Sequence, residues 1–283
     1  MRLEAYAKLN LGLNITGRLG NGMHTLDMLM QNISLSDGLA IEKADGISFC
    51  YDGMESDETN TAVQAAKAFF EYTHIGGGAD ISLEKRIPSQ AGLGGGSSDA
   101  GAVLSALNLL YETKLTTGEL VSIGVRVGAD VPFFIRGGCM RAQGIGEILE
   151  PVENNCDFSY LLVKPEGGVP TGLAYEKYHG LPVESPDIGS IADALAAGDA
   201  QAYFRAAGNA LMPAGIAICP QVGTILKECR ELGADFAMMT GSGSCVFAVF
   251  LQEKAREQAF AALAGKYPFC AEAENVDKAY EII

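Results

Sequence analysis

The chain has 283 residues, 48% of them hydrophobic and 19% charged, which excludes global disorder and allows one large domain or two ordinary ones. Its formal net charge of −15 argues against nucleic acid as a partner, because a phosphate backbone is neutralised by clustered Lys and Arg. The seven cysteines stand singly, without a CxxC pair or a Cys/His cluster, which predicts reduced thiols and no metal site built on cysteine.

The N-terminus gives the first indication of location. Residues 1–8 lack the charged and then apolar pattern of a secretory signal. The longest strongly apolar run, 245–251, has seven residues, whereas a membrane-spanning helix needs about 20. We therefore expect a cytoplasmic protein that makes no use of a membrane.

The first half of the chain predicts strands followed by helices. Alternating apolar and polar residues predict short strands at 3–7, 11–16, 26–35, 38–43 and 46–51, with turns at Asn21-Gly22 and at two Asp-Gly pairs. Residue 60 begins a helix whose apolar positions follow the 3.6-residue period. A strand at 80–85 then leads into a glycine-rich run, and helices are predicted at 98–111 and 120–127.

The second half has a different order of elements after a break near residues 150–157. We expect strands at 158–164, 235–239, 244–251 and 270–277, helices at 221–232 and 253–264, and helical stretches within 170–211. Apart from that helical insertion, the order β-α-β-β-α-β is ferredoxin-like. The sequence therefore predicts an α+β protein with a strand-rich domain at 1–152, a ferredoxin-like domain at 153–283 and a site in the cleft between them.

The glycine-rich run at 88–101 is the clearest candidate for a binding site. Five of its fourteen residues are glycine, and a helix follows at once. A bare backbone at a helix N-terminus presents several N–H groups and about half a positive charge, which suits phosphate. The predicted phosphate-binding residues are Pro88, Ser89, Gln90, Ala91, Gly92, Leu93, Gly94, Gly95, Gly96, Ser97 and Ser98.

Other interpretations of this run are weaker. No Gly-Lys-Ser/Thr ends it, so it is not a Walker loop. Ser97 stands where a dinucleotide-binding fingerprint has Gly or Ala, and no parallel βαβ unit begins there. A flexible linker is disfavoured because a strand and a helix flank the run directly. An acidic chain that binds a polyanion also needs a local group of cations, for which the candidates are Lys8, Arg18, Lys85, Arg86 and Lys164.

Three more segments carry polar side chains in suggestive places. Lys8 and Asn10 are two apart and share one face of a strand, where they need a partner or a ligand unless that face is simply solvated. Asp130 lies between a helix-ending glycine and Pro132, just before an apolar segment that we expect to be a strand; it is either a turn residue or a general base. The turn at 240–245 is either a plain hairpin loop or a second glycine-rich contact with a ligand.

Taken together, these segments resemble the three motifs of the GHMP kinases, which match residues 7–13, 88–100 and 239–247 in order. Within that family, the chain is most similar to the branch that acts on 4-diphosphocytidyl-2-C-methyl-D-erythritol. The matching segments are 7–11, 17–18, 21–24, 91–98, 128–133, 144–147, 170–171 and 240–243. The resemblance therefore spans nearly the whole chain.

The resemblance implies a kinase that moves the γ-phosphoryl group of ATP to the 2-hydroxyl of a cytidyl sugar alcohol for isoprenoid precursors. It implies Asp130 as the base, Lys8 beside the same hydroxyl, and a glycine loop that holds the triphosphate. Mg²⁺ is expected with ATP, and Ser98 is a candidate ligand. We expect a monomer or a weak homodimer.

The resemblance also implies how the acceptor is recognised. His24 matches the position that binds the cytosine, and Tyr175 matches an aromatic residue that stacks on it; Met23 stands where the family usually has Tyr. The implied substrate-binding residues are Asn10, His24, Thr171, Tyr175, Thr240, Gly241, Ser242 and Gly243. A homoserine or mevalonate kinase, or a non-catalytic nucleotide-binding protein of the same fold, remains an alternative, although binding alone requires no base.

Overall fold

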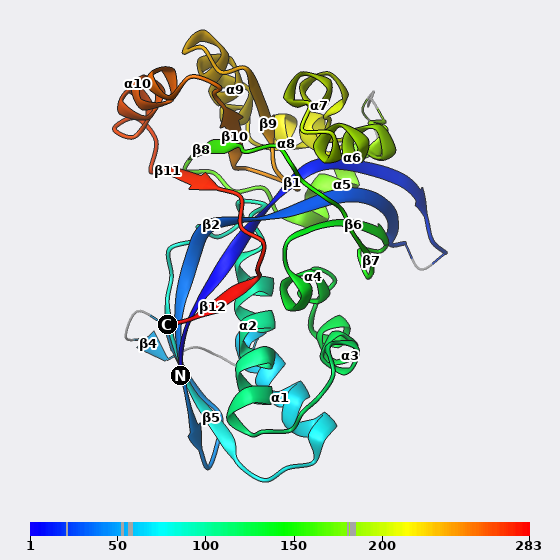
Figure 1. Ribbon diagram of the computed structural model, residues 1–283, viewed down its shortest axis with the longest axis vertical. Coiled ribbons are helices and arrows are strands. Elements are labelled where there is room, and N and C mark those ends of the chain that lie inside the picture. The colour runs from blue at the N-terminus through cyan, green and yellow to red at the C-terminus, as the bar shows by residue number, and fades with distance from the viewer. Residues whose placement is uncertain (21, 52–53, 56–58, 180, 182–184) are drawn as a thin grey trace.

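The computed structural model describes residues 1–20, 22–51, 54–55, 59–179, 181 and 185–283. Asn21, half of the predicted Asn21-Gly22 turn, lies outside these residues. Two sheets, each with helices packed against it, form the molecule, and the predicted α+β class is confirmed (Figure 1). The N- and C-termini lie close together on the first sheet (Figure 1).

Two long strands dominate the first sheet. β1 (Arg2–Arg18) and β2 (His24–Ala44) pair antiparallel along most of their lengths, with register shifts that mark β-bulges. The prediction of several short strands with a turn at Asp37-Gly38 was wrong. Gly38 lies inside β2 and pairs with Glu4 on one side and Glu84 on the other. A glycine that reads locally as a turn is held extended here by a strand on each side.

The remaining strands of this sheet extend it on both sides. They are β3 (Ser48–Tyr51), β4 (Met54–Glu55), β5 (Gly78–Glu84), β6 (Cys139–Gly144), β7 (Ile148–Pro151) and β12 (Tyr280–Ile282). Their order is β12-β1-β2-β5-β3-β4, while β6 and β7 form a branch from β2. The final strand was not predicted, and it returns the end of the chain from the second half to the first sheet.

Helices cover one face of this sheet. They are α1 (Thr61–Thr73), α2 (Gly95–Leu110), α3 (Thr117–Val127) and α4 (Val131–Arg136). Asn60 caps α1 by accepting a hydrogen bond from the backbone of Ala62. The segment after Asp130 is the helix α4 and not the predicted strand. Pro132 stands in its first turn, where a missing N–H costs nothing and the fixed φ angle favours a helix.

The second sheet has the predicted ferredoxin-like order. β8 (Ser159–Lys164), β9 (Phe236–Met239), β10 (Val246–Val249) and β11 (Phe269–Glu274) pair antiparallel in the order β11-β8-β10-β9. Its two helices are α9 (Gln221–Glu231) and α10 (Glu253–Leu263). The insertion after β8 contains α5 (Thr171–Tyr178), α6 (Ile188–Ala196), α7 (Ala200–Ala206) and α8 (Met212–Ile218).

A shared apolar layer joins the two halves and orients the start of the chain. Leu9 and Leu11 of β1 are fully buried in one cluster with Tyr160 of β8 and Phe247 of β10. Burying a leucine side chain contributes about 1.5–3 kcal/mol, so this layer fixes which face of β1 points inward. Side chains alternate along a strand, and the alternate residues of β1 at this point therefore face the other way.

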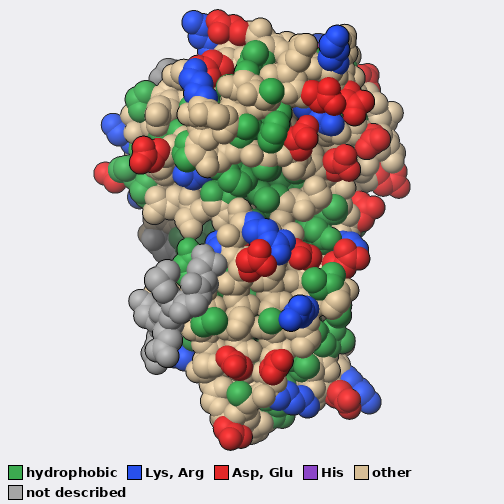
Figure 2. All heavy atoms as spheres, turned by 90° about the vertical axis from the view of Figure 1, so that its left-hand side faces the viewer, with side chains coloured by type: hydrophobic (Ala, Val, Ile, Leu, Met, Phe, Trp, Pro, Cys, Tyr) green, Lys and Arg blue, Asp and Glu red, His purple; other side chains and the backbone are tan. Residues whose placement is uncertain are grey.

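The surface agrees with the acidic composition. On the face shown in Figure 2, Asp and Glu side chains are interspersed with Lys and Arg, and the described part of this face carries no continuous basic stripe. No helix among the described residues is both long enough and apolar enough to cross a membrane.

Candidate active site

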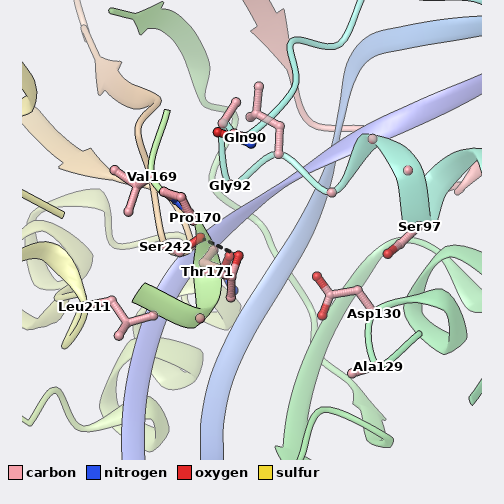
Figure 3. Close-up of a pocket in the computed structure, with 18 of the residues that line it drawn as sticks. Gln90, Gly92, Ser97, Ala129, Asp130, Val169, Pro170, Thr171, Leu211 and Ser242 are labelled. Carbon is pink, nitrogen blue, oxygen red and sulfur yellow. Dashed lines mark hydrogen bonds between the residues drawn. The ribbon is translucent and has the colours of Figure 1, made fainter. Parts of the chain in front are cut away.

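A cavity of about 1320 Å³ opens between the two halves of the chain. Strand β1, the glycine loop before α2, the N-terminal end of α4, the start of α5 and the turn before β10 all contribute to its wall (Figure 3). Every predicted site residue lines this cavity except Ser98, Thr240 and Gly243. Segments more than 200 residues apart in sequence thus meet in one place.

The glycine loop forms one wall of the cavity. Gly94 caps α2 with φ 74°, a left-handed angle, and the first residues of the helix line the cavity. The N–H groups of a first helical turn have no partner within the helix and carry its positive dipole end. Ser98 is different, because its hydroxyl donates to the carbonyl of Tyr6 at 2.7 Å and is buried. The structure thus directs Ser98, the candidate Mg²⁺ ligand, away from the cavity.

The turn at 240–245 holds the glycine loop in place. Thr240 is fully buried; its hydroxyl accepts from the Asn10 backbone N–H at 2.9 Å and donates to the Gly92 carbonyl at 3.5 Å. Gly92 has φ 76°, and a Cβ there would lie 2.1 Å from the Thr240 carbonyl oxygen. Thr240 therefore ties three segments together from behind the cavity wall. Only Gly241 and Ser242 of this turn face the cavity.

Lys8 and Asp130 approach the cavity from different elements. Lys8 is 4% exposed, and its ammonium donates to the side-chain oxygen of Asn10. Burial lowers the pKa of Lys8, and the Asp130 carboxylate acts in the opposite direction. Asp130 stands at the N-terminal end of α4, where its side chain makes no capping hydrogen bond. Its carboxylate remains directed into the cavity (Figure 3).

Aromatic side chains line the other end of the cavity. His24 and Tyr175 are stacked with ring centroids 4.7 Å apart and planes 16° apart. Burial, followed by the neighbouring Asp130 carboxylate, raises the pKa of Tyr175 to about 12. The two rings touch each other directly, so they form a closed aromatic pair. Thr171, one turn before Tyr175 on α5, shares a hydrogen bond of 3.0 Å with Ser242 (Figure 3).

His179 also lies beside His24 at this end of the cavity, although it was not predicted as a site residue. Its Nε2 lies 2.9 Å from the Nε2 of His24, so at least one of the two rings is neutral when they are hydrogen-bonded. Burial, His179 and Arg18 lower the pKa of His24, in that order. Its spacing could have indicated this position. His179 caps the end of α5 and follows Tyr175 by four residues, which places the two side chains on the same side of the helix.

A buried cluster of charged side chains, Asp37, Lys85 and Asp99, connects the segments on both sides of the glycine loop. The Lys85 ammonium bonds to Asp37 and, at 2.9 Å, to Asp99 in the first turns of α2. The second oxygen of Asp37 accepts the backbone N–H groups of Arg86 and Ile87. The cluster therefore fixes the strand end, the loop and the helix start together.

Of the predicted cations, Lys8, Arg18 and Lys85 line the cavity. Arg86 and Lys164 were also candidates to bind a polyanion at this site, but they do not line the cavity. Arg86 forms ion pairs with Glu4 and Glu84 on the outer face of the sheet. Lys164 is buried and donates to the neighbouring Pro165 carbonyl.

Asp99 gives the ion cluster a pH dependence. Burial raises the pKa of its carboxyl to about 7, against the opposing effect of Lys85. In the unfolded chain the pKa is about 4, so the folded state binds the proton more tightly and stability falls as pH rises between these values. We expect Asp99→Asn to remove this dependence. The midpoint of thermal unfolding of the variant should rise relative to that of the wild type as the pH increases from about 5 to about 8.

The matched control for that prediction is Asp80→Asn, which replaces an exposed carboxylate on β5. Its unfolding midpoint should stay at a constant offset from the wild type over the same pH range. A constant offset for Asp99→Asn as well would contradict the assigned titration.

The described residues contain no group of three or more His, Cys, Asp or Glu side chains placed to hold a metal ion. A divalent ion that enters with a phosphate ligand needs only one or two protein carboxylates, because the phosphates supply most of its oxygen ligands. The cavity wall carries the carboxylates of Asp99, Asp130 and Glu176. The cavity therefore fits a phosphate-bound ion better than a resident metal.

Two family profiles match the sequence of this chain. The sequence profile "GHMP kinases N terminal domain" matches residues 60–138, and "GHMP kinases C terminal" matches residues 191–268. The chain belongs to the GHMP kinase family. The first profile covers the glycine loop, α2 and Asp130, which are the GHMP kinase segments on the N-terminal side of the cavity.

Individual GHMP kinases are similar over almost their full length. A 4-diphosphocytidyl-2-C-methyl-D-erythritol kinase from Desulfitobacterium hafniense is 39% identical over 260 residues, which are 91% of this chain and 90% of that protein. A crystal structure of 4-(cytidine 5'-diphospho)-2C-methyl-D-erythritol kinase superposes with a TM-score of 0.83 at 33% identity, covering 97% of this chain and 99% of that one. Homoserine kinase from Cytophaga hutchinsonii, at 18% identity and a TM-score of 0.77, shares the fold.

Proposed function

We propose that the chain is an ATP-dependent kinase that phosphorylates the 2-hydroxyl of 4-diphosphocytidyl-2-C-methyl-D-erythritol in the non-mevalonate route to isoprenoid precursors. The names of the similar kinase and of the similar crystal structure support this substrate. The observation that carries the proposal is the single cavity lined by the glycine loop, by Lys8 and Asp130, and by the aromatic pair. Such a cavity has a place for a nucleotide, for a reacting hydroxyl and for a base.

The donor side follows from the backbone of the loop. Bound ATP supplies the phosphoryl group, with Mg²⁺ shielding the charge of its phosphates. Residues Gly92 to Ser97 would surround the triphosphate, and the N–H groups at the start of α2 point positive charge toward it. Because Thr240 and the Lys85 cluster hold the loop rigidly, these groups need no rearrangement during the reaction.

In this proposal, Asp130 and Lys8 act on the hydroxyl group of the acceptor. An alcohol is a poor nucleophile at neutral pH, so a positioned base accelerates its attack by about 10²–10⁴. Asp130 would accept the hydroxyl proton. Lys8, held by Asn10 on a rigid strand, would stabilise the forming alkoxide.

The aromatic end would bind the cytosine. His24 can hydrogen-bond the base through its ring nitrogens, while Tyr175 offers a flat face for stacking. Since the two rings now touch, the base must either separate them or stack on an outer face. Thr171 and Ser242 are placed to bind polar groups of the linker between base and acceptor.

Acceptor choice tests the proposal directly. ADP release should be measured with the cytidyl substrate, homoserine and mevalonate in parallel, at equal concentrations of ATP and Mg²⁺. We expect turnover with the cytidyl substrate alone. Preference for either of the other alcohols would instead indicate another branch of the family, and ATP binding without turnover of any would indicate a non-catalytic protein.

Met23 offers a gain-of-affinity test of the base site. It lines the cavity beside His24 and is 43% exposed. Met23→Tyr would add a second ring beside the cytosine, and an aromatic pair contributes about 0.5–1.5 kcal/mol beyond its buried area. We expect the KM for the cytidyl substrate to fall about 2- to 10-fold, as measured in steady-state kinetics.

The matched control for Met23 is Met23→Leu, which keeps an apolar side chain of similar size and should leave that KM unchanged. A KM that is unchanged or raised in Met23→Tyr would count against Met23 lying at the base.

We also propose that the enzyme works in the cytoplasm as a monomer or weak homodimer, and that its chain divides near residue 152 into an ATP-binding part and a ferredoxin-like part. One apolar core, whose buried members all lie between Leu3 and Val131, supports this division. The return of β12 to the first sheet shows that the last residues pack with the N-terminal part.

A further inference from the structure

Gln90 combines an unusual backbone with a place on the cavity wall. Four non-glycine residues among those described have φ in the left-handed region, namely His74, Gln90, Glu112 and Lys114, and Gln90 alone of these lines the cavity. Its φ is 51°. A side chain costs about 1–2 kcal/mol in this conformation, which glycine adopts freely. Such a conformation persists only where the surroundings impose it.

Two contacts impose it here. The Gln90 carbonyl accepts the Ser244 N–H at 3.2 Å, and the next carbonyl accepts the Cys245 N–H at 3.1 Å, so the loop is paired with the end of the turn at 240–245. The side chain of Gln90 then lies against Gly168. A Cβ on Gly168 would be 2.4 Å from the Gln90 Oε1 and 2.8 Å from its Cβ. The side chain therefore fits only because residue 168 is glycine.

The Gln90 side chain is exposed and forms no hydrogen bond within the part of the chain that the structure describes. It lies where the glycine loop meets the segment that begins α5, on the side of Val169 and Pro170 and away from Asp130 (Figure 3). That segment is anchored separately, because the Ser244 hydroxyl donates to the Gly167 carbonyl at 2.6 Å. Gln90 is thus a spacer between the two walls of the cavity.

We propose that Gln90 is a positioning residue that sets the distance between the glycine loop and the start of α5. Because α5 carries Thr171 and Tyr175, this spacing determines how the acceptor fits while the nucleotide is held by the loop. The inference rests on the proposed function, in which α5 binds the acceptor. It predicts that removing the spacer affects the acceptor and leaves the nucleotide largely unaffected.

The first variant is Gln90→Gly. It relieves the left-handed strain while making the unfolded chain more flexible, and these effects nearly cancel. We expect the midpoint of thermal unfolding to stay within about 2 °C. The KM for the cytidyl acceptor should rise about 3- to 10-fold, because a small misplacement of a binding group weakens its interactions. The KM for ATP should stay within about 2-fold.

The second variant, Gly168→Ala, tests the contact itself. Its methyl group collides with Gln90 in the wild-type chain, so the unfolding midpoint should fall by about 2–4 °C and the acceptor KM should rise. In the Gln90→Gly background the obstacle is gone, and the same substitution should cost much less. The matched control is Gly118→Ala on α3, whose Cβ would meet nothing closer than 3.9 Å; it should behave alike in both backgrounds.

The outcomes separate the inference from the function on which it rests. An unchanged acceptor KM in Gln90→Gly, or an ATP KM that rises equally, overturns the positioning role. Additive effects of the two substitutions on the unfolding midpoint show that the contact is absent, which also overturns it. If the wild type does not turn over the cytidyl acceptor, the proposed function fails, whereas the unfolding cycle requires no substrate and still decides the contact.

Discussion

Replacing Asp130 by alanine is expected to lower kcat for the cytidyl substrate by about 10²–10⁴. The loss follows from removing the only group proposed to accept the hydroxyl proton. The fold should survive, because the Asp130 side chain makes no capping hydrogen bond to α4. At most about 1 kcal/mol of charge–dipole stabilisation is lost at that helix end. Steady-state kinetics together with thermal unfolding of the same preparation measure both effects.

The control replaces a carboxylate that lies far from the cavity. Glu231→Gln removes a charge on α9 whose side chain is 61% exposed and pairs with Lys227. Its kcat should equal that of the wild type. Near wild-type turnover by Asp130→Ala would show that another group, or water, accepts the proton, and it would contradict the role assigned to Asp130.

Replacing Lys8 by methionine is expected to lower kcat by about 10²–10³, the usual loss when one preorganised charge is removed from a transition state. Methionine keeps most of the length of the side chain without its charge. Because burial lowers the pKa of Lys8, the charged side chain is unfavourable in the folded chain, and the variant should be at least as stable as the wild type. Loss of rate without loss of stability is the signature of a functional charge.

The pH dependence of stability provides a second measurement on Lys8. The pKa is lower in the folded chain than in the unfolded chain, where it is about 10.4. Unfolding therefore takes up a proton between these two values, and wild-type stability rises with pH there. The advantage of Lys8→Met should be largest near neutrality and should shrink as pH approaches about 10. Lys227→Met, an exposed lysine on α9, should show neither effect. Full activity of Lys8→Met would remove Lys8 from the mechanism.

Local sequence signals predicted the parts of the fold that depend on neighbours in the chain. The 3.6-residue period located α1, and the apolar runs located β8 and β10, because these elements are buried along one face or on both. The motif residues come from distant segments of the sequence and meet at one cavity. Lys8, Asp130 and the glycine loop lie on the same cavity, although nothing in their spacing alone required it.

The predictions that were wrong concern residues whose structure depends on partners far away in the sequence. Gly38 resembles a turn until strands β1 and β5 pair on either side of it. The apolar residues after Asp130 suit a strand or a helix equally, and packing of Phe134 against Gly94 and Gly101 accompanies the helix. β12 depends on the first strand of the chain. Short apolar runs cannot encode such choices locally.

The site itself showed the same limit. Its place in a glycine-rich turn predicted that Thr240 binds a ligand, yet Thr240 is buried and its hydroxyl bonds to the Gly92 carbonyl. His179 carries no motif, and only the approach of β2 to α5 brings it to His24. The Asp37–Lys85–Asp99 cluster joins three elements, so no segment of sequence contains it. These residues support the motif residues from positions that spacing does not reveal.

The central claim is phosphoryl transfer from ATP to one hydroxyl of the cytidyl acceptor. It is tested most directly by incubating the chain with ATP, Mg²⁺ and 4-diphosphocytidyl-2-C-methyl-D-erythritol and following the reaction by ³¹P NMR. We predict the signal of one new phosphomonoester. Its phosphate is bonded to the oxygen on carbon 2 of the methylerythritol group, and it forms in equal amount to ADP. Absence of that signal, or a phosphate on a different oxygen, would contradict the account.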